Sequence, residues 1–320
     1  MVAGGSGSSA SSLPPAGSIA EADGRRTAVR LFLYGAAMSS EDRSATSAVA
    51  EFRALHESGC FVMPNPWDVG TALYLERLGF KALATTSSGF AFSRGLPDST
   101  AAVPLAAMLE HIEEIARAAS VPVNADFLSG YADEPEGVAA NVTSCVETGA
   151  AGLSIEDSTG DEAAPLYERT LAIERVRAAR AAIDATGSQV VLTARCEAWL
   201  VGDPDPVRTA LDRLVAFADA GADCLYAPGV TDPDQIATIV RAVAPRPVNV
   251  LISSPAAGLS VAQLSDLGVR RISVGSGLAR VAWGAFIRAA TGLAENGSFD
   301  GFAGAASHAE LDAFFRDRLG

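Results

Sequence analysis

Lysine and histidine are the scarcest chemically useful residues in this chain of 320 residues. It has one lysine, Lys81, and three histidines, His56, His111 and His308. A Schiff-base enzyme needs a lysine in its active site, whereas a His-rich zinc site or a Ser-His-Asp triad needs histidines there. The positions of these four residues therefore decide which mechanisms remain open.

Net positive charge and long apolar runs are also absent. The chain has 24 Lys and Arg against 38 Asp and Glu, with a net charge of −14 and a pI near 4.6. We therefore expect no nucleic-acid or membrane partner. No apolar run reaches the roughly 20 residues of a transmembrane helix. The four cysteines lack the spacing of a metal site and indicate thiols in a reducing compartment, the cytoplasm, so small molecules are the expected partners.

The first 44 residues differ in composition from the rest of the chain. They are rich in Gly, Ser, Ala and Pro and show no periodicity that would bury one face. We expect residues 1–44 to form a disordered tail and residues 45–320 to form one folded domain. Arg25 and Arg26 before a short apolar stretch give only a weak export signal, because no convincing cleavage site follows.

From residue 45 onward, short apolar runs alternate with longer amphipathic stretches. The expected strands are 61–65, 82–88, 122–127, 152–157, 190–196, 224–229, 247–252 and 271–276. Eight strand-helix units over about 250 residues are typical of a TIM (β/α)8 barrel. An open doubly wound sheet is the alternative, since six strands would suffice for it, but no Gly-rich turn follows the first strand.

Active sites of TIM barrels lie where the strands end and the following loops begin. The polar residues at the expected strand ends are Asn65, Trp67, Asp68, Ser87, Ser88, Gly89, Asp98, Asp126, Glu156, Asp157, Arg195, Glu197, Tyr226, Asn249, Ser273 and Ser276. This set is acidic and contains a single arginine.

The scarce residues fall outside this set. Lys81 precedes the second strand and therefore lies at the opposite end of the barrel, which excludes a Schiff-base mechanism. His56 precedes the first strand, His111 lies within a helix and His308 is near the C-terminus. We expect all three to be partly solvated surface residues, with no triad and no zinc site.

A cluster of carboxylates remains, formed by Asp98, Asp126, Glu156 and Asp157. Hard oxygen ligands suit Mg²⁺ or Mn²⁺, which would chelate a 2-oxo carboxylate and stabilise the enolate formed when an adjacent bond breaks. Arg195 is expected to hold the substrate carboxylate, with backbone N–H groups of residues 87–89. The alternative is that these acids cap helices or pair with arginines, above all Asp98 and Asp157.

Several stretches carry a resemblance to a known family. They are MPNPWDVGTALYLERLGFKALATTSSGFAFSRGLPD, PVNADFLSGY, AGLSIED, LTARCEAWL, AGADCLYAPG, PVNVL and LGVRRISVGSGL. In this order they resemble the isocitrate lyase and phosphoenolpyruvate mutase superfamily, over roughly residues 47–290. The resemblance implies a TIM barrel that forms a homodimer or homotetramer by exchanging its last helices. It also implies Mg²⁺ chemistry on 2-oxo acids or their enolates.

The resemblance also implies roles for individual residues. Asp126 matches the metal-binding aspartate, Glu156 the carboxylate that reaches the metal directly or through water, and Asp98 the acid of the LPD turn. Arg195 matches the arginine that contacts the substrate carboxylate. The expected catalytic residues are Arg195, Asp98 and Glu156, and the expected substrate-binding residues are Trp67, Ser87, Ser88, Gly89, Arg195 and Asn249.

Two departures from the family pattern concern the chemistry. Leu128 replaces the second acid that the family carries before Gly130 and Tyr131. The loop at 158–165 lacks the Cys, Lys and His of isocitrate and methylisocitrate lyases, and also the Lys and Asn of a phosphoenolpyruvate mutase.

The favoured function is therefore a Mg²⁺-dependent C–C lyase or decarboxylase of a small 2-oxo or 2-hydroxy carboxylate. Oxaloacetate decarboxylation is compatible with it, because loss of CO₂ needs no acid from the loop. A phosphonate C–P mutase or hydrolase is one alternative, and a non-catalytic metabolite-binding barrel, suggested by Leu128, is another. Residues 308–320 predict an extra helix that packs either on its own barrel or on a neighbouring subunit.

Overall fold

The computed structural model describes residues 45–317, so the tail expected over 1–44 lies outside the described residues. The described chain belongs to two units, one of which ends at Ala305 and contains all the strands. The second unit includes α12 (His308–Arg316), a helix that begins with a capping box between Ser307 and Glu310. This helix confirms the secondary structure expected near the C-terminus.

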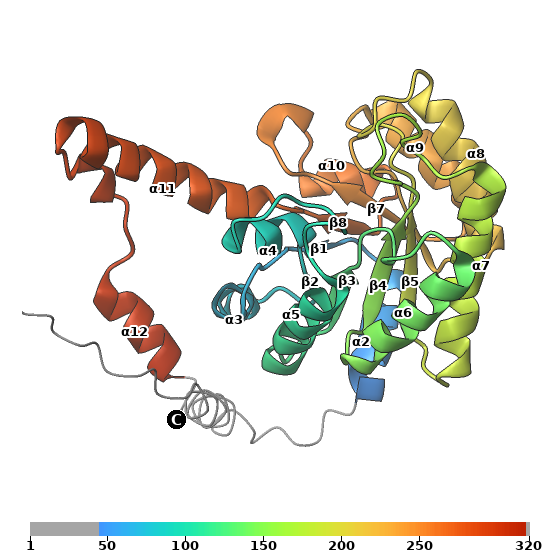
Figure 1. The fold of residues 1–320 in the computed structure, drawn as a ribbon, viewed down its shortest axis with the longest axis horizontal. Coiled ribbons are helices and arrows are strands. Elements are labelled where there is room, and N and C mark those ends of the chain that lie inside the picture. The colour runs from blue at the N-terminus through green and yellow to red at the C-terminus, as the bar shows by residue number, and fades with distance from the viewer. Residues whose placement is uncertain (1–44, 318–320) are drawn as a thin grey trace, which may run out of the picture. The chain divides into compact units, whose positions relative to one another are not determined.

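Eight parallel strands form the barrel in the order β1-β8-β7-β6-β5-β4-β3-β2 (Figure 1). They are β1 (Phe61–Met63), β2 (Leu83–Ala84), β3 (Val123–Asp126), β4 (Gly152–Glu156), β5 (Val191–Arg195), β6 (Cys224–Tyr226), β7 (Val248–Leu251) and β8 (Arg271–Ser273). The strand order begins at β1 and ends at β2. A hydrogen bond of 3.1 Å from the Ala84 amide to the Pro64 carbonyl joins the chain at these two strands. The structure thus confirms the TIM barrel and excludes the open sheet.

Helices alternate with the strands, and most of them pack around the barrel, whereas α11 extends away from it (Figure 1). They are α2 (Ala45–Glu57), α3 (Val69–Arg77), α4 (Ser87–Ser93), α5 (Leu105–Ala118), α6 (Pro135–Glu147), α7 (Arg169–Ala185), α8 (Pro206–Asp219), α9 (Pro233–Val243), α10 (Val261–Asp266) and α11 (Gly277–Asn296), with 3₁₀ turns η1 (Pro255–Ala257) and η2 (Asp300–Phe302). Several acidic residues cap these helices: Asp68, Asp205 and Asp232 each accept a backbone N–H. No helix within residues 45–317 has the length and apolar character needed to cross a bilayer.

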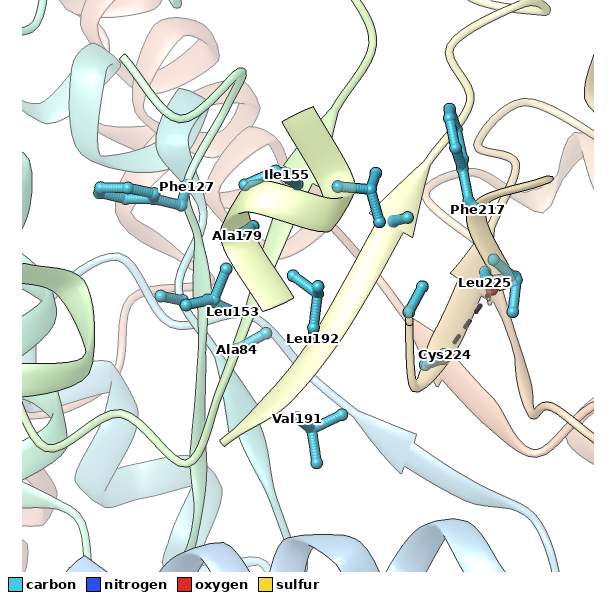
Figure 2. Close-up of a cluster of buried hydrophobic side chains, with 14 of the residues drawn as sticks. Ala84, Phe127, Leu153, Ile155, Ala179, Val191, Leu192, Phe217, Cys224 and Leu225 are labelled. Carbon is cyan, nitrogen blue, oxygen red and sulfur yellow. Dashed lines mark hydrogen bonds between the residues drawn. The ribbon is translucent and has the colours of Figure 1, made fainter. Parts of the chain in front are cut away.

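The main core lies between the outer faces of the strands and the helices. Figure 2 shows Leu153 and Ile155 of β4 and Leu192 of β5 gathered around Ala179 of α7. Buried parallel strands are apolar along most of their length, as the sequence indicated. At the amino end of the barrel, a Cβ on Gly152 would lie 2.5 Å from a ring carbon of Phe52, so α2 can pack there only against a glycine.

Two expectations about local structure are wrong. The second strand ends at Ala84 rather than at 88, because Thr86 caps α4 and the chain turns into that helix at Ser87. His111 is not a solvated histidine, since only 4% of it is exposed and its ring stacks on Phe90 at 4.1 Å. Burial and the charge of Arg94 lower the pKa of His111 to about 4.

Candidate active site

Most of the expected strand-end residues line a pocket of about 270 Å³, whereas Glu156, Asp157 and Glu197 do not. Its lining includes Ser87, Asp98, Asp126, Arg195 and Asn249, which come from four different strand-helix units. A larger hollow of about 910 Å³ lies on the surface beside the start of α8 and contains none of these residues. The pocket at the strand ends is therefore the candidate active site.

Arg195 is the centre of the charged groups in this site. Its Nη1 lies 2.7 Å from Asp126 Oδ1, its Nη2 3.0 Å from Glu156 Oε2, and its Nε 2.9 Å from Glu197 Oε1. Although burial acts to lower it, the carboxylates of Glu197, Glu156 and Asp126 hold the pKa of Arg195 well above its usual value. Burial raises the pKa of both glutamates. One cation therefore faces three carboxyl groups, and burial disfavours a negative charge on two of them.

Asp126 is held on both of its oxygens. Its Oδ2 accepts hydrogen bonds of 3.0 Å from the amide and from the hydroxyl of Ser87, while Oδ1 faces Arg195. The Gly89 amide donates to the Thr86 hydroxyl at 3.2 Å. Two of the three amides that were expected to bind a substrate carboxylate thus have protein acceptors, so the small-residue turn positions Asp126 instead.

Asp98 lies at the rim of the pocket, in the loop after α4. Its side chain lies near the hydroxyls of Ser87 and Ser88, which line the same pocket. Partial burial and the neighbouring Asp126 carboxylate raise the pKa of Asp98 above its usual value. The structure therefore places Asp98 with Asp126, as expected, although the two residues come from different loops.

Glu156 and Asp157 are adjacent in sequence but point to different environments. Asp157 is buried, pairs with Arg213 at 3.0 Å and accepts the amide of Glu197 at 2.8 Å. Neither Glu156 nor Asp157 lines the pocket, but Glu156 pairs with Arg195 whereas Asp157 pairs with Arg213, so the expected place of Asp157 in the carboxylate cluster is wrong. Glu197 takes that place through its contact with Arg195.

Asn249 lies in the pocket wall, and Trp67 does not. The Asn249 Oδ1 accepts from Arg271 Nε, and its Nδ2 donates to the Ser273 hydroxyl, each at 2.9 Å. Trp67 packs beside α4: a Cβ on Gly89 would lie 3.0 Å from the Trp67 Cβ. Close packing thus accounts for Gly89, and nothing in the geometry brings Trp67 to the pocket.

Sequence reasoning placed Glu197 and Tyr226 at strand ends without giving them a role and did not select Arg271, although the structure places all three around the site. Glu197 and Tyr226 fall at strand ends, which was the available signal. Arg271 lies at the start of β8, where a residue is expected to support the fold, yet its side chain reaches the pocket lining. No local pattern marks that direction.

The loop after β3 has an unusual backbone. Leu128 and Tyr131 have φ values of 49° and 58°, a left-handed conformation that side chains other than glycine seldom adopt. The Leu128 carbonyl accepts the Glu156 amide at 2.9 Å, and Arg175 of α7 donates to the Ser129, Ala132 and Asp133 carbonyls. Contacts from two neighbouring elements therefore hold this loop in its conformation beside Asp126.

The donor set of the pocket suits a small divalent cation. No group of three or more His, Cys, Asp and Glu side chains within residues 45–317 is arranged to enclose a metal. Mg²⁺, however, usually engages one or two carboxylates and keeps several waters. Asp126 and Asp98 both line the pocket, and three carboxyl groups surround Arg195. These residues therefore fit Mg²⁺ or Mn²⁺.

Comparison with known proteins identifies the family. The phosphoenolpyruvate phosphomutase family model matches residues 52–294, so the chain belongs to this family. An uncharacterized protein of Mycobacterium tuberculosis is 35% identical over 231 residues, 70% of this chain and 81% of that protein. The 2-methylisocitrate lyase of Salmonella typhimurium is 34% identical over 166 residues, 50% of this chain and 55% of the enzyme.

Solved structures agree with this family. A putative lyase/mutase from Burkholderia cenocepacia has a TM-score of 0.80 and 46% identity, covering 85% of this chain and 96% of that one. Oxaloacetate acetylhydrolase in complex with the product oxalate has a TM-score of 0.76 and 27% identity, covering 87% and 97%. The protein is thus an enzyme of the isocitrate lyase/phosphoenolpyruvate mutase superfamily of lyases and mutases, whose members generally depend on Mg²⁺.

Proposed function

We propose that this protein is a Mg²⁺-dependent lyase or decarboxylase that cleaves a C–C bond in a small 2-oxo or 2-hydroxy carboxylate. The observation that carries the proposal is the Arg195 guanidinium bound between Asp126 and Glu156 at the strand ends. It combines a fixed cation for a carboxylate substrate with acidic groups for a metal. The relatives named for 2-methylisocitrate and oxaloacetate chemistry support this substrate class.

Asp126 would hold the Mg²⁺ or Mn²⁺, and Glu156 would reach it directly or through water. When bound, the ion would act as a Lewis acid toward the substrate's carbonyl oxygen. Ser87 keeps one oxygen of Asp126 in place, so the carboxylate is already oriented before substrate enters. Leu128 contributes no oxygen, and this site therefore offers one acid fewer than the family pattern.

The remaining chemistry falls to residues of the pocket itself. Arg195 stays charged and binds the substrate carboxylate through N–H groups beside Asp126. The raised pKa of Asp98 lets its carboxyl carry a proton at the pocket rim more readily than an ordinary aspartate. This residue would replace the acid that the loop at 158–165 lacks, by delivering a proton to the carbon left after cleavage.

Calorimetry with oxalate tests this proposal directly. Oxalate resembles the enolate of pyruvate, and we expect it to bind only when Mg²⁺ or Mn²⁺ is present. Turnover of oxaloacetate and 2-methylisocitrate, followed as release of pyruvate, then separates decarboxylation from C–C cleavage with an aldehyde or acid product. If oxalate binds equally well with and without the metal, or does not bind at all, the result contradicts the proposal and favours a non-catalytic barrel.

We also propose that the protein acts as a homodimer or homotetramer through α11. Val281, Trp283, Phe286 and Ile287 of this helix are exposed, as are Phe299 and Phe302 around the η2 turn. An apolar surface of this kind usually marks an interface. Sedimentation at micromolar concentration should give two or four chains per particle, and Phe286→Asp should shift the protein toward single chains.

The four free thiols support a reducing compartment such as the cytoplasm.

A further inference from the structure

A buried arginine lies below the carboxylate cluster without an acidic partner. Arg271 of β8 is 1% exposed, and it forms no ion pair with any carboxylate within residues 45–317. Instead it donates to three neutral acceptors: Asn249 Oδ1 at 2.9 Å, Thr193 Oγ1 at 2.9 Å and His56 Nε2 at 3.2 Å. Buried charges are normally paired, so this arrangement calls for a functional reason.

The acceptor role of His56 follows from its other contact. Its Nδ1 lies 2.7 Å from the Phe52 carbonyl, which can only accept, so Nδ1 carries the hydrogen and Nε2 is free to accept from Arg271. Burial and the Arg271 charge lower the pKa of His56 to about 3, and the ring stays neutral. Arg271 is therefore the cationic end of this group of hydrogen bonds.

Because a guanidinium can only donate, Arg271 fixes the direction of the bonds that follow. Asn249 must turn its oxygen toward Arg271, and its Nδ2 then donates to the Ser273 hydroxyl at 2.9 Å. Ser273 accepts from Asn249, so its own hydrogen is free to be donated to the neighbouring Tyr226 hydroxyl. When Ser273 donates to Tyr226, the hydroxyl hydrogen of Tyr226 is available to a ligand.

Tyr226 lies beside Ser273 inside the candidate active site. It is the last residue of β6, lines the same pocket as Asp126 and Arg195, and is 8% exposed. The Arg195 guanidinium carbon lies 5.2 Å from the centre of the Tyr226 ring. Hydrogen bonds thus join Arg271, Asn249 and Ser273, and Ser273 lies beside Tyr226 in the lining of the pocket.

We propose that the Tyr226 hydroxyl donates a hydrogen bond to a substrate oxygen that carries or gains negative charge, beside the carboxylate bound by Arg195. Tyr226 is then a catalytic residue, and Arg271, Asn249 and Ser273 are positioning residues that keep its hydrogen directed at the substrate. The inference rests on the proposed function only in taking the ligand to be a carboxylate.

The protonation of Tyr226 agrees with this role. Burial raises its pKa to about 12, whereas the positive charge of Arg195 and the neighbouring Ser273 hydroxyl act to lower the pKa. At neutral pH the hydroxyl therefore keeps its hydrogen and serves as a donor rather than as a base. A neutral donor adds no charge to a cluster that already holds three carboxyl groups around Arg195. A hydrogen-bond donor that is fixed before the reaction stabilises negative charge most where that charge develops.

Four variants test these hydrogen bonds: Tyr226→Phe, Ser273→Ala, the double variant and Ser273→Thr. Calorimetry with oxalate at saturating Mg²⁺ gives the affinity of each, and Tyr74→Phe removes a hydroxyl from the exposed face of α3 as the control. We expect Tyr226→Phe to weaken oxalate about 10- to 100-fold, because a hydrogen bond to a charged group is lost. Ser273→Ala should weaken oxalate binding less than Tyr226→Phe does. Ser273→Thr keeps a hydroxyl and should bind oxalate almost as tightly as wild type.

The double variant decides whether Ser273 acts through Tyr226. It should bind oxalate as weakly as Tyr226→Phe alone, since removing the hydroxyl makes the direction of these hydrogen bonds irrelevant. Unchanged oxalate affinity in Tyr226→Phe overturns the inference while leaving the proposed function intact, and so do strictly additive losses. If the wild-type protein does not bind oxalate at all, the proposed function and the inference both fail.

Discussion

Arg195 of β5 and Asp126 of β3 meet across the intervening strand β4, with Nη1 and Oδ1 2.7 Å apart. The other oxygen of Asp126 is held by Ser87, so this carboxylate joins a cation on one side to the start of α4 on the other. The residue proposed to bind the metal and the residue proposed to bind substrate are therefore in direct contact. A change in either one is expected to alter the other.

Asp126→Ala should abolish metal-dependent turnover and oxalate binding while the barrel remains folded. The side chain faces the pocket, so its removal costs little packing but takes away the central carboxylate. Turnover, oxalate calorimetry and thermal unfolding together measure the effect. Asp212→Ala, which breaks an exposed pair with Arg169, is the matched control and should retain activity. Retained metal-dependent turnover in Asp126→Ala would sink the proposed metal site.

Arg195→Met should destabilise the protein by about 3–5 kcal/mol, because three carboxylates lose their shared partner. Arg195→Lys keeps the positive charge but loses the planar guanidinium and its several N–H groups. It should be destabilised less than Arg195→Met, and its activity should be about 10²-fold below that of wild type. Urea unfolding with and without Mg²⁺ provides the check. We expect Mg²⁺ to stabilise Arg195→Met more than wild type, since the ion replaces part of the missing charge. Equal stabilisation of both proteins would argue against a cation site beside Arg195.

Glu156 and Asp157 should behave in opposite ways. Asp157→Asn weakens a buried pair with Arg213 and should cost about 3 kcal/mol of stability, while kcat stays within about twofold of wild type. Glu156→Gln should lose most activity with a smaller change in unfolding. Kinetics and urea unfolding on the same preparations distinguish the two residues. Loss of kcat in a folded Asp157→Asn variant would return this residue to the active site.

Leu128→Asp should tighten Mg²⁺ binding by restoring the acid that the loop lacks. Aspartate also adopts the left-handed conformation found at this position, φ 49°, more readily than leucine does. Leu128→Asn is the control with the same shape and no charge, and it should leave the affinity for Mg²⁺ unchanged. Calorimetric titration of the metal gives both values. Identical affinities for the two variants would place this side chain away from the metal.

We expect the free energy of unfolding to decrease in mild acid because His111 is buried in its neutral form. Its folded pKa of about 4 is below the value of 6.5 in the unfolded chain, so below pH 6.5 the unfolded state binds a proton that the folded state excludes. The stabilisation is complete above pH 6.5 and is lost progressively toward pH 4. His111→Phe keeps a ring against Phe90 and removes this loss. Urea unfolding at pH 7 and 5 should therefore show a smaller difference in the variant than in wild type.

Much of the fold and part of the site followed from local patterns. Alternating apolar runs located all eight strands, and the strand-end rule selected Asp126, Arg195 and Asn249, which do line one pocket. The end of the second strand was misplaced because a single hydroxyl, that of Thr86, starts a helix within an apolar stretch. His111 was misplaced because one residue on a helix does not reveal which neighbour covers it.

The sequence by itself determined the order and type of the elements, the barrel, and the end of the barrel at which chemistry is expected. Periodicity and capping act over a few residues and can be found in the chain directly. Only the tertiary structure decided that Glu156 faces Arg195 while Asp157 faces Arg213, and that hydrogen bonds join Arg271, Asn249 and Ser273 beside Tyr226. Those outcomes depend on partners that are distant in the sequence: Asp157 and Arg213 are separated by 56 residues, and His56 and Arg271 by 215. A charged side chain takes its role from the groups that surround it in the folded chain, because those groups set its burial, its pKa and its direction.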